Sequence, residues 1–287
     1  MKSLFELFGK PEYLFDSHAH INDESYDEDL KKIIQNAQDN NVKEIFDVSV
    51  NKISCEKSIL ISKENEFVKS FIGIDPDVLI PTSELFEGLH FKIDWFNITR
   101  FKLSKLIENN IENVIGVGET GIDLYWIEKA LADGQINEFE YNESIRLQRE
   151  LFELHLDIAK EFVLPLTIHS RNAEDLCLEI VKSKDAVGIF HSYGGDYEIA
   201  KRILDNGWGL GVNGIVTFKN AEDVRKMYRK ILGKISYDVS PSDFYEKGIF
   251  FETDSPFLTP HPKRGTRNEP ANVSSIFEQF IASLIND

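Results

Sequence analysis

Short apolar runs rich in β-branched residues alternate along the chain with stretches that carry apolar residues at helical spacing. Eight of these runs predict strands, and several are almost continuously apolar, as strands buried on both faces are. They cover residues 13–20, 42–50, 67–74, 113–120, 164–170, 186–193, 208–215 and 248–254. The segments between them have a different period, which decides the fold class.

Apolar residues three and four positions apart predict helices between and after the strands. Such stripes run from Leu30 to Ala37, from Leu176 to Val181 and from Val273 to Leu284. Strands that alternate with helices form parallel βαβ units, and eight such units predict a (β/α)₈ TIM barrel. An open doubly wound sheet is the alternative, because sequence does not show whether a sheet closes. We find no linker and expect one domain over residues 1–287, with 1–12 as an N-terminal extension.

Two segments are longer than short connections require. Residues 76–98 and 127–141 are predicted to extend the loops after the third and fourth strands. Long loops in compact domains often serve function. Each of these two loops is either an elaboration of the surface or a lid over the substrate.

Composition narrows the class of protein. The 287 residues are 42% hydrophobic and 28% charged, as in ordinary globular proteins. The net charge of −17 argues against a broad basic surface for nucleic acid, although bound cations and a few local basic residues can still attract phosphate. The absence of a signal-peptide pattern and of an apolar run of about 20 residues predicts no membrane partner. The only cysteines, Cys55 and Cys177, suit a reducing, cytoplasmic location.

Six residues with metal-binding side chains stand at or near the C-terminal ends of predicted strands. In a barrel these ends form the face that carries the active site. The six are His18, His20, Glu119, His169, His191 and Asp254. Any one of them has an ordinary structural explanation, such as a hydrogen-bonded core histidine or a helix cap. Their joint placement instead predicts a metal site, and six ligands are more than one ion ordinarily uses.

Two divalent ions that share a carboxylate can activate a water and stabilise the charge that develops in hydrolysis. Glu119, on the fourth of eight strands, is predicted to be the shared carboxylate. Asp254 is predicted both to bind an ion and to accept the proton of the attacking water. His155, on a predicted helix, is expected to be structural.

Several motifs also resemble the TatD family of metal-dependent hydrolases, within the amidohydrolase-like barrels. The resemblance covers roughly residues 13–287. The matching segments are "FDSHAHI", "GVGETGIDLY", the helix from Gln148 through "LDIAKEFVLPLTIHSRNA", "GIFHSYGG", "GVNGIVTFKNAEDVRK" and "FFETDSPFLTPHPKRGTRNEPANV". The last is especially specific, since no generic structural reason makes so long a signature recur.

The resemblance implies a barrel that works as a divalent-metal-dependent deoxyribonuclease, often a 3′ to 5′ exonuclease, with DNA as its substrate. By position it implies the same six metal ligands. It also has departures: where the family commonly reads G-I-H-P-H, this chain has "GIDPDVLI", so Asp75 and Asp77 replace two imidazoles. These two carboxylates would repel phosphate unless a metal or a proton compensates their charge.

Local positive charge is available near the predicted site. Arg171 follows His169 by two residues, and its planar guanidinium suits a phosphate. Lys263, Arg264 and Arg267 follow Asp254 and either contact a nucleic-acid backbone or belong to a solvated loop.

The function predicted from the sequence is therefore hydrolysis of DNA phosphodiesters by a metal-activated water, on single-stranded ends. The two ions are expected to be Mg²⁺, Mn²⁺ or Zn²⁺, since imidazoles favour the softer metals whereas nuclease chemistry favours magnesium. A related barrel hydrolase for an amide, ester or lactone is the first alternative, supported by the acidic charge. A non-catalytic metal-binding scaffold is the second.

Overall fold

The computed structural model describes residues 3–83, 94–184 and 186–285. Eight strands form one parallel sheet in consecutive order. They are β1 (Asp16–Ala19), β2 (Ile45–Val48), β3 (Val68–Ile72), β4 (Val114–Gly121), β5 (Leu166–His169), β6 (Gly188–Phe190), β7 (Gly209–Val212) and β8 (Ile249–Phe251). Each lies within a run predicted to be a strand, except that β4 extends one residue beyond its run, to Gly121.

The two ends of the sheet meet beyond β8. Ala19 pairs with Ser255 as an isolated parallel bridge. The His20 N–H donates to the Ser255 carbonyl, and the Asp254 N–H donates to the His18 carbonyl, both at 2.8 Å. The sheet is thus a nearly closed (β/α)₈ barrel, which confirms the predicted fold over the open doubly wound alternative.

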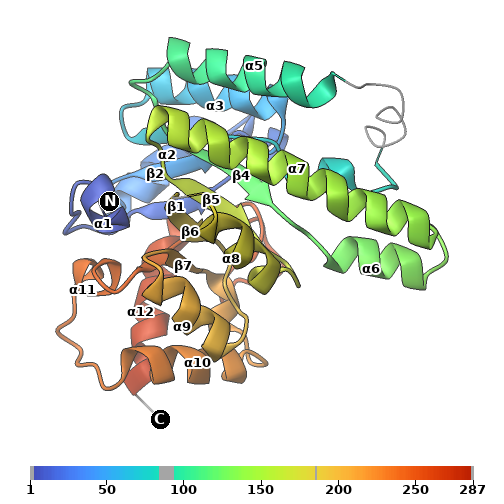
Figure 1. The fold of residues 1–287 in the computed structure, drawn as a ribbon. Coiled ribbons are helices and arrows are strands. Elements are labelled where there is room, and N and C mark those ends of the chain that lie inside the picture. Colours follow the sequence, from blue (N-terminus) through green and yellow to red (C-terminus); the bar gives the residue numbers. More distant parts are fainter. Residues whose placement is uncertain (1–2, 84–93, 185, 286–287) are drawn as a thin grey trace.

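Helices surround the sheet (Figure 1). They are α1 (Leu4–Leu7), α2 (Leu30–Asp39), α3 (Lys52–Glu64), α5 (Trp95–Asn109), α6 (Tyr125–Ala132), α7 (Glu138–Phe162), α8 (Glu174–Lys182), α9 (Tyr197–Asp205), α10 (Glu222–Leu232), α11 (Pro241–Tyr245) and α12 (Asn272–Ile285). Within the described ranges there are also three short 3₁₀ turns, η1 (Glu24–Tyr26), η2 (Pro76–Leu79) and η3 (Gly214–Thr217).

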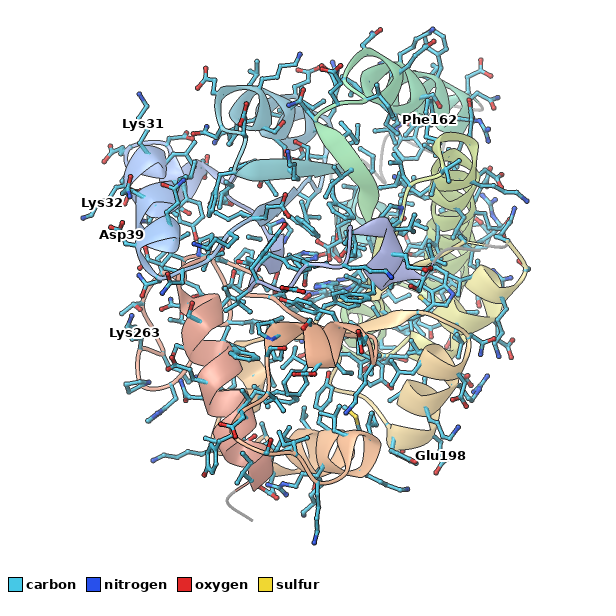
Figure 2. The ribbon with its side chains drawn as sticks, turned by 90° about the vertical axis from the view of Figure 1, so that its left-hand side faces the viewer. Lys31, Lys32, Asp39, Phe162, Glu198 and Lys263 are labelled. Atoms are coloured by element: carbon cyan, nitrogen blue, oxygen red, sulfur yellow. The ribbon has the colours of Figure 1, made fainter. Side chains whose placement is uncertain are left out.

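Helix α2 illustrates how the predicted stripes become buried faces. Ile33 and Ile34 are buried in the hydrophobic core. Lys31, Lys32 and Asp39 point outward from the same helix in Figure 2. The period of 3.6 residues separates these two faces.

The prediction of an extended loop over residues 127–141 is wrong. Helix α6 occupies the first part of this segment and α7 begins at Glu138. Ile127 and Ala130, three residues apart, are buried, and this short apolar stripe makes α6 a helix. In Figure 1, α6 and the first turns of α7 extend outward beyond the strands. The other predicted loop begins with η2 and ends in α5, and its residues 84–93 lie outside the described residues.

The predicted N-terminal extension packs against the end of the barrel at which the strands begin. Leu4 in α1 is buried. The Phe8 ring lies 5.2 Å from Phe46 and 5.8 Å from Phe250 between centroids, and 6.1 Å from Phe15. These three partners stand at the starts of β2, β8 and β1, so the extension covers that end with aromatic side chains.

The residues that the structure describes include no helix that is both long and apolar enough to cross a bilayer. Cys55 and Cys177 are both buried free thiols.

Candidate metal centre

The six residues predicted as metal ligands gather at the end of the barrel where the strands finish. His18, Glu119 and His169 lie within β1, β4 and β5. His20, His191 and Asp254 follow β1, β6 and β8 within three residues. Among the described residues, three groups could each hold a cation: His18 with His20 and Asp254, His18 with Glu119 and His191, and Asp75 with Glu119 and His169.

Buried hydrogen bonds join β1 to the segment after β8 and so align the first group. Asp16, which is fully buried, accepts hydrogen bonds from the Thr253 hydroxyl at 2.5 Å and from the Thr253 N–H at 2.9 Å. Burial raises the pKa of Asp16 to about 7, against these hydrogen bonds. The pair places His18 and Asp254 at adjacent positions on neighbouring backbones.

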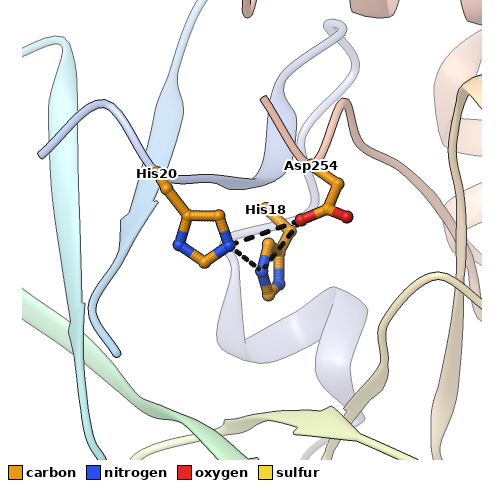
Figure 3. Close-up of side chains that lie close together, drawn as sticks. All are labelled: His18, His20 and Asp254. Atoms are coloured by element: carbon orange, nitrogen blue, oxygen red, sulfur yellow. Dashed lines mark hydrogen bonds and ion pairs between the residues drawn. The ribbon is translucent and has the colours of Figure 1, made fainter. Parts of the chain in front are cut away.

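The imidazoles of His18 and His20 face each other through their Nε2 atoms, 3.2 Å apart (Figure 3). Asp254 Oδ1 lies 3.3 Å from Nε2 of His20 and 3.8 Å from Nε2 of His18. Nδ1 of His20 donates a hydrogen bond to the Val48 carbonyl at 2.8 Å, because a carbonyl can only accept. Against burial, the hydrogen bond to Asp254 and the charge of Glu119 raise the pKa of His20 to about 10, so Nε2 of the metal-free ring carries a proton. A bound cation would take the place of that proton.

The two carboxylate oxygens of Glu119 contact two different sets of imidazoles. Oε2 is 3.6 Å from Nε2 of both His18 and His20. Oε1 is 2.8 Å from Nε2 of His191 and 2.9 Å from Nδ1 of His169. Glu119 is only 4% exposed, so most of its surface faces these partners.

Burial and neighbouring charge set the protonation of the cluster. Burial, aided by His191, lowers the pKa of His18 to about 4, so this ring is neutral and can donate a lone pair. Burial also opposes charge on Glu119, but His191 and the hydrogen bond from His169 outweigh it and hold the Glu119 pKa well below its usual value. The site thus combines a neutral imidazole with an ionised carboxylate, the forms that bind metal.

The donor set fits divalent cations. Four imidazoles and two carboxylates converge, and two of the imidazole nitrogens approach to 3.2 Å. Facing lone pairs repel unless a proton or a cation lies between them. A metal ion bound by neutral imidazoles satisfies such nitrogens without adding protons.

Two carboxylates that the sequence analysis did not select lie directly behind these histidines. Asp123 Oδ2 is 2.8 Å from Nε2 of His169. Glu252, fully buried, has Oε1 at 3.9 Å from Nδ1 of His191. A carboxylate that is hydrogen-bonded to an imidazole, as Asp123 is to His169, orients a metal-binding histidine, whereas Glu252 is too far from His191 for a hydrogen bond. Their signals in the sequence are an aspartate four residues after Glu119 and a charged residue inside an apolar strand.

The cavity beside the cluster is acidic. Of the described residues that line it, Arg171 is the one Lys or Arg, three are histidines, and six have carboxylates: Asp23, Asp75, Asp77, Glu119, Asp123 and Asp254. The guanidinium of Arg171 stacks over the Tyr125 ring, 3.7 Å from its centroid, and 5.4 Å from that of Trp126. This stacking fixes Arg171 at the cavity wall through rings instead of an acidic partner.

The three other basic residues singled out from the sequence have partners within the chain. Arg267 pairs with Asp29 at 2.6 Å. Lys263 donates to the Asn272 side-chain oxygen at 3.1 Å, and Arg264 lies over the Phe218 ring. Arg267 in particular is held away from the metal-ligand cluster by its ion pair.

His155 lies apart from the cluster, in α7. Its Nδ1 donates to the Leu151 carbonyl at 2.8 Å, and its Nε2 accepts from the Ile74 N–H at 3.0 Å. These two bonds require a neutral ring, and burial lowers the His155 pKa to about 4.

Comparisons with known proteins agree with this geometry. A family model described as TatD related DNase matches residues 15–286. The chain is 32% identical over 271 residues to YabD of Bacillus subtilis, named as an uncharacterized metal-dependent hydrolase, covering 93% of this chain and 89% of that protein. It is 30% identical over 276 residues to a Buchnera aphidicola protein of the same description, with the same two coverages. The crystal structure of YjjV, a TatD homologue from Escherichia coli, matches with a TM-score of 0.71 at 19% identity, over 96% of this chain and 98% of that one.

Proposed function

The chain belongs to the TatD-related DNase family of metal-dependent hydrolases, and from that premise we propose that it hydrolyses phosphodiester bonds of DNA. We propose a 3′ to 5′ exonuclease that acts on single-stranded ends, with two divalent ions as cofactors. The observation that carries this proposal is the carboxylate of Glu119, whose two oxygens face two different sets of imidazoles.

In this proposal His18, His20 and Asp254 would hold one ion and His169 and His191 would hold the other. Glu119, whose two oxygens face the two sets of imidazoles, would contribute to both. Bound divalent ions supply Lewis acidity that activates water and neutralises charge on the phosphate. The short contacts of Glu119 with His169 and His191, both under 3 Å, support the ion position at these two histidines. The His18, His20 and Asp254 group supports the other.

Asp254 is the proposed proton acceptor. Oδ1 faces His20 and His18, whereas the second carboxylate oxygen points away from both rings in Figure 3. That oxygen, Oδ2, can take the proton of the attacking water while Oδ1 stays with the imidazoles. Hydrogen bonding to His20 and the neighbouring histidines offset burial and lower the Asp254 pKa, so its carboxylate is ionised and ready to accept.

Arg171 is the proposed phosphate-binding residue. It lines the cavity on the side of Tyr125 and has its guanidinium fixed by stacking. A fixed planar guanidinium binds phosphate oxygens with little further loss of side-chain entropy.

Two exposed aromatic side chains support single strands as the substrate. Trp126 and Phe257 both line the cavity and are 41% and 57% exposed. Exposed rings bind unpaired bases by stacking, regardless of their sequence. Paired bases do not present their faces in this way.

A nuclease assay over a metal panel tests the proposal. We expect the purified protein to release nucleotides from single-stranded DNA with Mg²⁺ or Mn²⁺, and Glu119→Ala to abolish this release. Turnover of esters or lactones without any cleavage of DNA would instead support the small-molecule alternative, which the six cavity carboxylates favour. Elemental analysis of the isolated protein shows whether it contains metal and so tests the non-catalytic scaffold. That alternative requires that metal-loaded protein cleave neither DNA nor esters and lactones.

A further inference from the structure

The third ligand group contains a residue outside the proposed set of six. Asp75, Glu119 and His169 each offer one atom, and these atoms lie within 4.8 Å of one another. Asp75 follows β3 and caps η2, on the part of the barrel rim next to β4. It is the position at which the resembling family commonly has the first imidazole of G-I-H-P-H.

The backbone and one oxygen of Asp75 are fixed. Its N–H donates to the Val50 carbonyl at 2.9 Å, and its Oδ1 accepts the Asp77 N–H at 2.8 Å. The residue is 8% exposed, and no Lys or Arg among the described residues forms an ion pair with it. A carboxylate buried beside Glu119 without a Lys or Arg partner is unfavourable unless a cation or a proton compensates its charge.

The His169 ring is oriented toward the same point. Asp123 holds Nε2 at 2.8 Å and leaves Nδ1 facing Glu119 at 2.9 Å. A carboxylate that binds one imidazole nitrogen makes the other nitrogen the ligand atom. Nδ1 of His169, an oxygen of Glu119 and an oxygen of Asp75 therefore converge on one position.

Resting on the proposed function, we propose that Asp75 is an additional ligand of the cation held between Glu119 and His169. An oxygen ligand at this place, where an imidazole would supply nitrogen, shifts the preference of that position toward the hard cations Mn²⁺ and Mg²⁺ and away from Zn²⁺. The negative charge of Asp75 thereby serves to bind metal and no longer repels phosphate.

Metal titration of the full-length protein tests this inference without any assay of catalysis. Apo-protein prepared with a chelator is titrated with Mn²⁺ by calorimetry, with free Mn²⁺ followed by electron paramagnetic resonance. Asp75→Asn keeps the oxygen that accepts the Asp77 N–H and removes the charge. We expect this variant to bind one Mn²⁺ at least about tenfold more weakly than the wild type.

Asp77→Asn is the matched control, because Asp77 is exposed, lines the same cavity and lies outside the ligand group. We expect its Mn²⁺ affinities to stay within about twofold of the wild type, since an exposed carboxylate that supplies no ligand atom is solvated and contributes little. Asp75→His provides a second variant, which we expect to lower Mn²⁺ affinity and raise Zn²⁺ affinity at the same position.

Equal Mn²⁺ affinities in Asp75→Asn and Asp77→Asn, or an unchanged Mn²⁺ to Zn²⁺ preference in Asp75→His, would overturn the inference. These outcomes are independent of substrate. If the wild type fails to cleave DNA while Asp75→Asn still loses Mn²⁺ affinity, the proposed DNA substrate is wrong and the role of Asp75 stands.

Discussion

At the scale of single residues, the hydrogen bond at one ring nitrogen of a histidine determines which nitrogen is left to bind a metal. Thr167 lies 2.8 Å from Nδ1 of His18, and Val48 accepts from Nδ1 of His20. Both histidines are thereby left with Nε2 facing the centre. The neighbour on the far side of each ring decides the ligand atom, as is usual at metal sites.

Asp254→Asn tests the proton acceptor at this scale. The amide keeps the shape of the carboxylate but cannot accept a proton, so we expect kcat for DNA to fall by roughly 10²- to 10⁴-fold with KM changed far less. Single-turnover kinetics at saturating Mn²⁺ measure the chemical step. If kcat is unchanged and kcat/KM falls only because KM rises, Asp254 contributes to binding and is not the proton acceptor.

Arg171→Ala tests the phosphate contact. A charged hydrogen bond is worth about 1.5–3 kcal/mol, so we expect KM for DNA to rise by about tenfold or more. Arg149→Ala removes the same charge from an exposed position of α7 and is the control. Equal rises in KM for the two substitutions would mean that Arg171 affects DNA binding only through the net charge of the protein.

At the scale of elements, the site depends on how helices hold the loops that follow the strands. His155 of α7 fixes the Ile74 N–H directly before Asp75. Ser144 of the same helix donates to the Leu79 carbonyl at the end of η2. Helix α7 therefore anchors the segment on which Asp75 lies, although it contributes no residue to the ligand groups.

The neutral state of His155 predicts an acid-sensitive contact. Its folded pKa of about 4 lies below the ordinary value of 6.5, so the unfolded chain binds the proton first as pH falls. Its contribution to stability is complete above pH 6.5 and is lost between pH 6.5 and 4, by about 2 kcal/mol at pH 5.

Urea unfolding of the metal-free protein at pH 7.5 and 5.0 measures this effect. The wild type includes other titrating groups, so the comparison is with His155→Gln, which cannot charge. We expect the drop in free energy of unfolding between the two pH values to be smaller in the variant by about 2 kcal/mol. Identical drops would contradict the assignment.

For the whole molecule, the two ends of the barrel have different tasks. The end where strands begin is covered by α1 and by aromatic contacts such as Phe8 with Phe46. The other end carries the ligand groups and the acidic cavity. Stability and function are thus separated along the barrel axis, as in other barrels of this class.

Phe8→Ala tests this separation. Because Phe8 is partly buried among three phenylalanines, we expect a loss of about 2 kcal/mol in free energy of unfolding, with kcat and KM unchanged. Phe139→Ala is the matched control, since that ring is 70% exposed. Denaturant unfolding and the nuclease assay measure both quantities, and a change in KM alone would argue against a separate structural end.

Much of the architecture could be predicted because it depends on local pattern. The eight strands and the stripes of α2, α8 and α12 follow from residue period and burial. The error at residues 127–141 has a local cause as well, since the stripe of α6 is only two buried residues long. The position of the six proposed ligands at strand ends could also be predicted from the sequence, because all parallel strands of a barrel end at one face.

Contacts between residues far apart in the chain were decided only by the closed barrel. Sequence order does not tell which carboxylate approaches which imidazole, because Asp123 meets His169 across 46 positions and Glu252 approaches His191 across 61. The same holds for Asp75, a departure visible in the sequence whose approach to Glu119 and His169 required β3, β4 and β5 to lie side by side. The sequence by itself therefore determined the elements and the kinds of ligand. The tertiary structure decided their pairing, because side-chain geometry exists only once the sheet has closed.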